Sequence, residues 1–368
     1  MINYISNIDT IYILVDIEDY EENCRELIQL LMDRRERAKL NDKDNLQHRE
    51  LLSINDMTFQ ILPNSCKGYA FILKNDDYEL KISQYKSKIK SFYPIQVRIS
   101  SEMLWGEGIS NAWSFIYNWI AETFGNILDN KVCRLDICTH VSDIDFTSNY
   151  DKVYKGKFKK TQVFHTGKDI NCLSFGSRKG KNIYCRIYNK TLEVEETKKK
   201  SWFRNLWLDN NLNFRNVWNV EFEIKSELLR RYDISSVLDV TNSLKDIWQF
   251  CTKEWLIKID RTNSRVERCK VNSKWIEIQK CYDNFKSKKL IEKEKQYLID
   301  AEILIPNIVG SITSYSARKN NLKIKDVFDE LMKKTEKYLL NKDTNFENEV
   351  NKKQKILNTI KKGDNKNG

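Results

Sequence analysis

The residues that could do chemistry are clearest around Tyr188, in the segment 183–193 (IYCRIYNKTLE). Polar and apolar side chains alternate there, as in a strand with one buried face, and the polar set is Tyr184, Arg186, Tyr188 and Lys190. A tyrosine between two cations can attack phosphorus, because the cations favour phenolate and hold a phosphodiester nearby. A half-buried edge strand with Arg and Lys in solvent has the same pattern, so other parts of the chain must decide.

A second alternating strand is expected over residues 132–141, with Arg134, Asp136, Cys138 and His140 on one face. An Asp in the middle of an otherwise apolar strand is costly to bury and needs a partner. Arg134 is the structural candidate for that partner. A metal ion shared by Asp136 and His140 is the functional alternative.

A third strand is expected over residues 217–225, with Glu221, Glu223 and Lys225 on the polar face. Two acids on one strand face can form a solvated ladder, or they can supply hard oxygen ligands to Mg²⁺ or Mn²⁺. Together the three strands would provide a nucleophile, flanking cations and a carboxylate-rich metal site. Phosphodiester cleavage by a tyrosine uses these parts.

Three segments of the chain resemble conserved segments of the Rep_trans family, and they occur in the same order. This family comprises the replication initiation factors of rolling-circle plasmids and the related relaxases of integrative conjugative elements. The turn 175–178 (FGSR) followed by 185–193 (CRIYNKTLE) resembles the tyrosine signature of that family. The segments 134–136 (RLD) and 218–221 (WNVE) resemble its R-[IL]-D and W-x-x-E strands. The resemblance covers roughly residues 60 to 280.

The resemblance implies that Tyr188 is the nicking nucleophile, with Arg186 and Lys190 beside it, and that it forms a 5′-phosphotyrosyl bond and leaves a free 3′-hydroxyl. It also implies a divalent ion, Mg²⁺ or Mn²⁺. Asp136 and Glu221 are the best ligands, and Glu223 and His140 are further candidates. His140 stands where the family often has an acid, and it can ligate Mn²⁺ or act in proton transfer.

The expected function is therefore that of a sequence-specific DNA strand transferase, which nicks one strand at an origin to initiate rolling-circle replication of a plasmid or mobile element. The alternatives are a transfer relaxase of an integrative conjugative element, a DNA-binding protein that binds an origin without cutting, and a structural module with solvated strand faces. No His-x-His pair occurs among the three histidines, which excludes the histidine-pair rolling-circle nucleases. No P-loop occurs either, so a host helicase would have to be recruited.

Composition favours a nucleic-acid partner over a membrane surface, because the formal net charge is +11 and the pI is near 9.0. The expected DNA ligand is the origin, as a hairpin or a single-stranded nick site. Candidate phosphate contacts are Arg178, Lys179, Lys181, Lys159 and Lys160, for each of which a solvated charge is the simpler interpretation.

Nine scattered cysteines without a C-x-x-C pair predict neither a disulfide framework nor a zinc site. They indicate reduced, mostly buried residues in a cytoplasmic protein. We expect no signal peptide and no membrane span, because no stretch is long and apolar enough.

The order of apolar patterns predicts an α+β fold, with a largely antiparallel β-sheet as the catalytic core, flanking helices and a mainly helical C-terminal region. The expected parts are an N-terminal α+β part of the core (1–130), a catalytic part with the nucleophile and metal strands (131–240), a helical region (241–340) and a basic flexible tail (341–368). A buried strand is expected over residues 10–17, an amphipathic helix over residues 326–340 and an exposed loop over residues 195–201. A homodimer through the C-terminal helices is a further expectation.

Overall fold

The computed structural model describes residues 2–43, 50–87, 92–180, 182–197, 200–288, 290, 305–320 and 323–354. It divides the chain into two compact units, Met1–Lys293 and Glu294–Gly368. The first unit contains all three strands that the sequence analysis singled out. The boundaries expected inside residues 1–240 stay predictions.

The first unit is built on one antiparallel sheet of eleven strands, in the order β2-β3-β4-β5-β6-β1-β7-β12-β11-β10-β9. A separate two-stranded ribbon pairs β8 with β13. The strands are β1 (Tyr4–Ile17), β2 (Leu51–Ile54), β3 (Met57–Ile61), β4 (Phe71–Lys74), β5 (Tyr78–Ile82), β6 (Ile95–Ile99), β7 (Ile127–Ser142), β8 (Tyr154–Gly156), β9 (Thr161–Thr166), β10 (Asp169–Gly176), β11 (Ile183–Asn189), β12 (Val217–Lys225) and β13 (Leu256–Lys258).

The helices and helical turns of this unit lie between and after the strands. They are α1 (Tyr20–Asn23), α2 (Arg25–Lys43), α3 (Ser101–Gly106), α4 (Gly108–Phe124), α5 (Tyr150–Val153), α6 (Lys190–Thr197), α7 (Phe203–Asp209), α8 (Ser226–Arg231), α9 (Val237–Phe250), the π-helical turn Cys251–Trp255, the 3₁₀ turn Val266–Arg268 and α10 (Ser273–Gln279).

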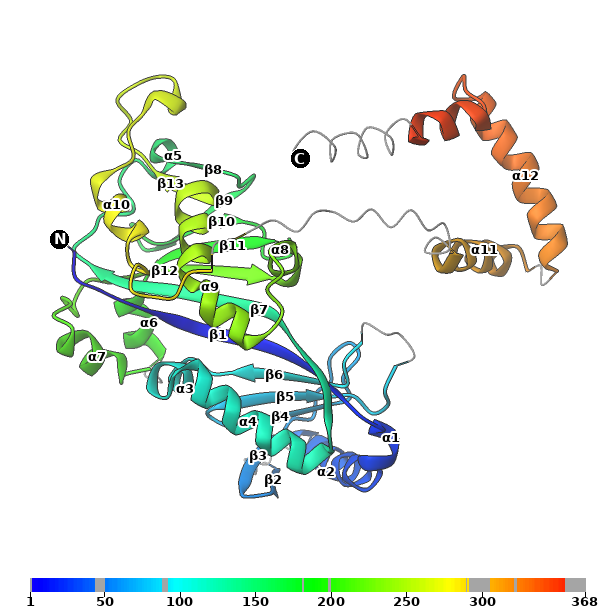
Figure 1. Ribbon diagram of the computed structural model, residues 1–368, viewed down its shortest axis with the longest axis horizontal. Coiled ribbons are helices and arrows are strands. Elements are labelled where there is room, and N and C mark those ends of the chain that lie inside the picture. The colour runs from blue at the N-terminus through cyan, green and yellow to red at the C-terminus, as the bar shows by residue number, and fades with distance from the viewer. Residues whose placement is uncertain are drawn as a thin grey trace. The chain divides into compact units, whose positions relative to one another are not determined.

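The sheet has two halves with the same chain path, and they meet where β1 pairs with β7 (Figure 1). In each half a long strand leads to a meander whose last strand returns to pair with the first, β6 beside β1 and β12 beside β7. A short helix and then a longer one follow that last strand, α3 and α4 in the N-terminal half and α8 and α9 in the second. We call these the N-terminal half and the Tyr188 half.

Helices α4 and α9 lie on the same face of the sheet (Figure 1). Ile116 and Ile120 of α4 are fully buried there, and Trp248 of α9 packs edge-on against Phe222 of β12, with ring centroids 5.5 Å apart. These contacts remove the apolar side chains of both halves from water, which is the main stabilising contribution to such a sheet. The alternate residues of the strands are left for the opposite, polar face.

A smaller aromatic cluster covers one end of the polar face. It combines Phe203 and Trp207 of α7 with Ile5 and Val217 from the sheet, and Trp105 of α3 packs against it. This cluster lies next to the first turn of α6, so it keeps water from the end of β11 that carries Tyr188.

The unit Glu294–Gly368 contains the helices α11 (Ile305–Lys319) and α12 (Ile324–Leu340), and residues 346–354 are also helical. Tyr315 of α11 donates a hydrogen bond to Glu330 of α12 at 2.8 Å. The helix expected over residues 326–340 is confirmed by the bounds of α12, in which Val327 is buried. Half of the expected basic tail (341–368), residues 355–368, lies outside the described residues. Within the part of the chain that the structure describes, every helix is too short or too polar to span a membrane.

The expected α+β fold with a helical C-terminal region is confirmed, and the structure corrects three boundaries. The strand expected to begin at Thr10 begins at Tyr4, because residues 4–8 pair with the end of β7. The strand expected to reach Lys190 ends at Asn189, whose side chain accepts a hydrogen bond from the backbone N–H of Leu192 at 3.1 Å and starts α6. Helix α6 extends to Thr197, so the first part of the loop expected at 195–201 is helical.

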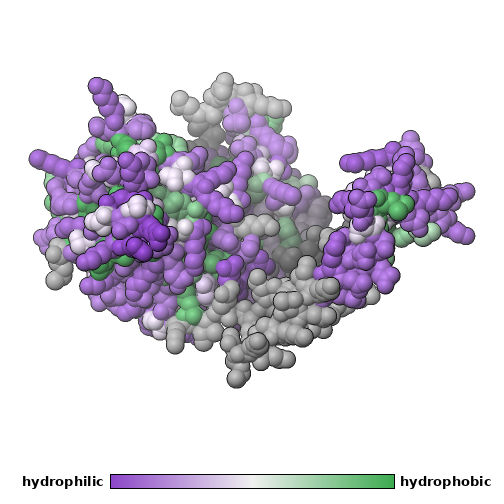
Figure 2. Space-filling view, turned by 90° about the horizontal axis from the view of Figure 1, so that it is seen from above, coloured by the Kyte–Doolittle hydropathy of each residue, from purple (hydrophilic) through white to green (hydrophobic). Residues whose placement is uncertain are grey.

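Figure 2 shows hydrophilic side chains over most of the face that it displays, with small hydrophobic patches between them. This agrees with a mean hydropathy of −0.62 and a net charge of +11.

Candidate active site

The sheet order brings the three strands of interest side by side, as β7, β12 and β11. Asn219 of β12 lies opposite Tyr188 on one side and His140 on the other. Two residues along, Glu221 lies opposite Arg186 and Cys138. After two more residues, Glu223 lies opposite Tyr184 and Asp136. The polar side chains therefore share one face, as the alternation predicted.

The hydroxyl group of Tyr188 has three side-chain partners. It donates a hydrogen bond to Oε2 of Glu221 at 3.1 Å, and it accepts one from Nδ2 of Asn219 at 3.0 Å and one from Nζ of Lys190 at 3.1 Å. The three partners are almost completely buried, with Lys190 and Asn219 at 0% exposure and Glu221 at 2%. A phenol oxygen held by one acceptor and two donors is positioned for proton loss toward the acceptor.

The pKa of Tyr188 is raised well above its usual value of 10. Burial is the largest cause, and the negative charges of Glu221, Glu193 and Asp9 act in the same direction. The Arg186 guanidinium opposes them but does not prevail. The expectation that flanking cations favour phenolate is therefore wrong for this resting state, because burial and the carboxylates around the ring together outweigh the cations. The phenol is neutral at neutral pH and needs a base to become a nucleophile.

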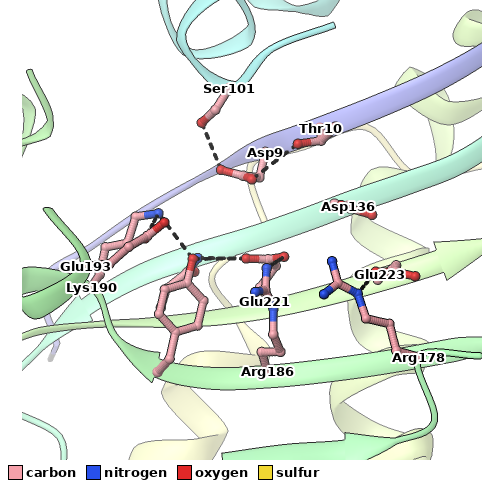
Figure 3. A network of polar contacts seen from close by, with 12 residues as sticks. Asp9, Thr10, Ser101, Asp136, Arg178, Arg186, Lys190, Glu193, Glu221 and Glu223 are labelled. Carbon is pink, nitrogen blue, oxygen red and sulfur yellow. Dashed lines mark hydrogen bonds and ion pairs between the residues drawn. The ribbon is translucent and has the colours of Figure 1, made fainter. Parts of the chain in front are cut away.

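Lys190 reaches Tyr188 from the first turn of α6 rather than from β11, and acids surround its amino group (Figure 3). Its Nζ pairs with Glu193 at 2.5 Å, and Asp9 of β1 lies close enough to act on it electrostatically. Burial alone would lower the pKa of Lys190, but the charges of Asp9 and Glu193 raise it above the usual value. Lys190 therefore keeps its charge although water does not reach it. Asp9 is in turn fixed by Ser101, which donates a hydrogen bond to it at 2.8 Å.

Arg186 lies beside the phenol and holds Glu221. Its guanidinium pairs with Oε1 of Glu221 at 2.5 Å, and its Cζ lies 5.2 Å from the centroid of the Tyr188 ring. The other carboxylate oxygen of Glu221 accepts the hydrogen bond from the phenol. Arg186 therefore fixes the orientation of the group that would act as base. Its side chain is 35% exposed, so it can also reach a phosphate that approaches from solvent.

Arg134 binds the two other acids of this face. It forms a two-point hydrogen bond with Asp136, at 2.8 and 2.6 Å, and also pairs with Glu223 at 2.8 Å. Burial raises the pKa of Asp136 to about 7 in spite of Arg134, and the nearby Glu221 and Glu223 add to the rise. In this structure Asp136 is therefore a buried acid whose partner is Arg134, which is the structural alternative given above.

His140 lies in the aromatic cluster and not among the carboxylates. Nε1 of Trp207 donates a hydrogen bond to its Nδ1 at 3.1 Å, and Trp105 stacks on the imidazole with ring centroids 5.2 Å apart. Burial lowers the pKa of His140 well below its usual value, so the ring is neutral. Because Nδ1 accepts this bond, Nε2 carries the proton and has no lone pair to offer a metal ion.

The expected Mg²⁺ or Mn²⁺ site can be tested against these contacts. Asp136, Glu221 and Glu223 are the right kind of donor for a hard cation. In this arrangement, however, guanidinium groups bind all three carboxylates. Among the described residues, no group of three or more His, Cys, Asp or Glu side chains is placed to hold a metal ion. The residues as arranged do not fit the expected ion, and the mechanism below uses none.

The candidate phosphate-binding residues gather at the end of the sheet away from Tyr188. Lys159 and Lys160 precede β9 and are exposed, and the backbone carbonyl of Lys160 accepts a hydrogen bond from the N–H of Gly176 at 2.8 Å. Arg178 and Lys179 are exposed in the turn that follows Gly176. Lys181, the fifth candidate, lies outside the described residues.

Gly176 makes that turn possible. Its φ is +87°, and a Cβ there would lie 2.9 Å from the carbonyl oxygen of Ile183. The Phe-Gly-Ser-Arg segment therefore needs glycine at this position to bring Arg178 back over β12, where Nε lies 3.8 Å from Glu223.

Asn219, Asp9 and Glu193 also belong to this site, although the sequence pattern did not single them out. Asn219 lies two residues before Glu221, so the strand alternation was a signal that could have found it. Glu193 was visible in the tyrosine segment. Asp9 is brought to Lys190 by β1, which the sequence analysis began one residue too late to include it.

Comparisons with known proteins find a distant structural likeness and no match of sequence. No family model matches it, and no curated protein matches its sequence. A solved structure that resembles it is a rolling-circle replication initiator protein from Geobacillus stearothermophilus, with 12% sequence identity and a TM-score of 0.42. The match covers 78% of this chain and 100% of that chain.

Proposed function

We propose that this chain is a DNA strand transferase that nicks one strand at an origin and thereby initiates rolling-circle replication of a plasmid or mobile element. The observation that carries the proposal is the set of three side-chain partners on the Tyr188 hydroxyl, Glu221, Asn219 and Lys190. A structural tyrosine on a strand needs one hydrogen-bond partner, whereas a base and two donors on the same oxygen suit a nucleophile.

In the proposed reaction the oxygen of Tyr188 forms a bond to the scissile phosphorus as its proton passes to Oε2 of Glu221. The bond from phosphorus to the 3′ oxygen breaks, and that oxygen takes a proton from solvent to give a 3′-hydroxyl. The 5′ end remains attached to Tyr188 as a phosphate ester, so the reverse reaction can rejoin a strand. Lys190 and Asn219 stabilise the negative charge that develops on the phenol oxygen.

Arg186 supplies positive charge at the edge of the site, where it orients Glu221 and can bind a non-bridging oxygen of the phosphate. A divalent ion remains a prediction from the family resemblance. It would require Asp136, Glu221 or Glu223 to exchange a guanidinium partner for the metal.

The test is nicking of a supercoiled plasmid that carries the element's own origin, with Mg²⁺, with Mn²⁺ and with a chelator. We expect the parent protein to nick the DNA and become attached to its 5′ end, and Tyr188→Phe to bind the origin without cutting. Tyr184→Phe, on the same face of β11, is the matched control and should cut normally.

Two outcomes would overturn the proposal. If Tyr188→Phe still cuts, the nucleophile is another residue. If the parent protein binds the origin and cuts under none of the three conditions, the chain is a DNA-binding protein that does not cleave.

A further inference from the structure

A pocket of about 390 Å³ opens on the polar face next to Glu223. The residues of its wall that matter here are Tyr12, Gln96, Arg134, Arg178, Glu223 and Lys225. We call it the Arg178 pocket. Its volume is in the usual range for a site that binds a small organic group. None of its cations takes part in the contacts of the Tyr188 hydroxyl.

The charges of the Arg178 pocket favour an anion. Three cations face a single carboxylate, that of Glu223, in its wall. Arg178 is the most available of them, because its side chain is 64% exposed and its ion pair with Glu223 is long, at 3.8 Å. Asp136 pairs with Arg134 at 2.6 Å and is not among the residues that line the pocket. Lys159, Lys160 and Lys179 are exposed at the same end of the sheet.

Tyr12 gives the pocket an aromatic wall. Its ring is half-buried, and the guanidinium carbon of Arg134 lies 5.0 Å from the ring centroid. Stacking on an aromatic ring next to a cation is how proteins hold unpaired bases without reading their sequence. Phosphate-binding cations and a stacking ring in one pocket suit a nucleotide better than a free phosphate.

The place of the pocket relates it to the nucleophile. Along β12, Asn219 marks the position of Tyr188 and Glu223 marks the pocket, four residues or about 14 Å farther on. Arg186 lies between them, opposite Glu221. Figure 3 shows Lys190, Arg186 and Arg178 following one another along these strands. A stacked strand advances about 3.4 Å per nucleotide, so the pocket lies within about four nucleotides of the scissile phosphate.

We propose that the Arg178 pocket binds one nucleotide of the cut strand, its phosphate at Arg178 and its base against Tyr12, and thereby selects which phosphate reaches Tyr188. This inference rests on the proposed function for the identity of the strand. The pocket itself can be tested without cleavage.

The first experiment needs no cut site. Binding of a single-stranded oligothymidylate of about 12 nucleotides is measured for Tyr188→Phe and for the same protein with a second change. We expect Arg178→Gln and Tyr12→Leu each to weaken binding about tenfold. Arg204→Gln is the matched control, because Arg204 is also exposed and has a similarly long ion pair, 3.7 Å to Glu195. Unchanged binding by both pocket variants would overturn the proposal, even if the nicking experiment succeeds.

The second experiment places the nucleotide. Oligonucleotides that span the mapped nick carry one neutral methylphosphonate, moved one position at a time. One position should weaken binding to Tyr188→Phe about tenfold. At that position the neutral linkage should not weaken binding by the Arg178→Gln variant any further. The Arg204→Gln variant should still show the full tenfold loss of binding. Parallel profiles for the parent and Arg178→Gln at every position would show that the pocket holds no phosphate of this strand.

Discussion

The two halves of the sheet follow the same chain path and expose the same polar face, yet they treat charge differently. In the N-terminal half, Glu79 of β5 pairs with Lys81 and with Arg98 of β6, each at 3.6 Å, and all three side chains are partly in solvent. In the Tyr188 half, Glu221 and Asp136 pair with arginines at 2.5 and 2.6 Å and are almost completely buried. The same scaffold thus carries a weak surface network on one side and an enclosed one on the other.

The cause of the difference is the cover over the polar face. Helix α6 and the aromatic cluster of Phe203, Trp207 and Trp105 close the end that carries Tyr188. At the other end, Arg134 pairs with both Asp136 and Glu223. Burying charge in this way is costly unless each charge has a partner, and such sites are where proteins shift pKa values for chemistry. Burial of paired charge, rather than the presence of charge, distinguishes the candidate active site from its counterpart.

The largest expected difference between the two halves is in the rate of nicking when Glu221 or Glu79 is replaced. We expect Glu221→Gln to lower the rate of nicking by about 10²–10⁴-fold, because the amide cannot accept the phenol proton. Glu79→Gln should leave the rate unchanged, since Glu79 lies in the half without a nucleophile. The measurement is single-turnover nicking with the origin DNA saturating, so that altered binding does not enter. Equal rates for the two variants would remove Glu221 from the role of base.

The two lysines give the next largest contrast. Lys190→Met leaves Asp9 and Glu193 without their buried cation, so we expect it to lower the free energy of unfolding by about 3–5 kcal/mol. Lys81→Met removes a partly exposed partner of Glu79 and should cost less than about 1 kcal/mol. Urea denaturation of both variants measures these values.

A double variant separates charge from packing at Lys190. If the cost comes from the acids that lose the charge of Lys190, Lys190→Met combined with Glu193→Gln should regain part of the lost stability. No recovery would mean that the packing of the lysine stem, rather than its charge, holds α6 in place.

Strand alternation was enough to predict the α+β class and the polar faces of β7, β11 and β12. It could not predict which strands are neighbours, because side-chain periodicity reports the face of a strand and not its partner. Alternation places Asn219 on the polar face of its strand, but only the pairing of β11 with β12 shows that it lies opposite Tyr188. Asp9 was missed because its partner Lys190 is distant in sequence.

His140 and Lys190 show how tertiary context overrides a pattern. Both were placed correctly on the polar side of the sheet, yet α7 covers one and α6 carries the other. The pattern therefore suggested a metal ligand where the structure has an aromatic enclosure. It suggested cations that favour phenolate, where burial and then the nearby carboxylates raise the pKa of Tyr188.

The last expected effect is a dependence of the free energy of unfolding on pH, caused by Asp136. The pKa of Asp136 is about 7 in the folded protein and about 3.9 in an unfolded chain. Between these values the unfolded chain gives up a proton that the folded protein keeps, so Asp136 makes the free energy of unfolding fall as pH rises from about 4 to about 7. The total fall is at most about 4 kcal/mol. Asp136→Asn cannot titrate, so its stability relative to the parent should rise over this range and then level off.

Asp145 provides the opposite case in the same half. Hydrogen bonds from Ser148 and Thr147 lower its pKa to about 2 although burial opposes them, so its contribution is complete above about pH 4. The stability difference between Asp145→Asn and the parent should therefore be constant from about pH 5 to about pH 8. Thermal or urea unfolding across this range distinguishes the two acids. A constant difference for Asp136→Asn as well would mean that Arg134 keeps Asp136 charged throughout, and that burial in this half leaves the carboxylate ionised.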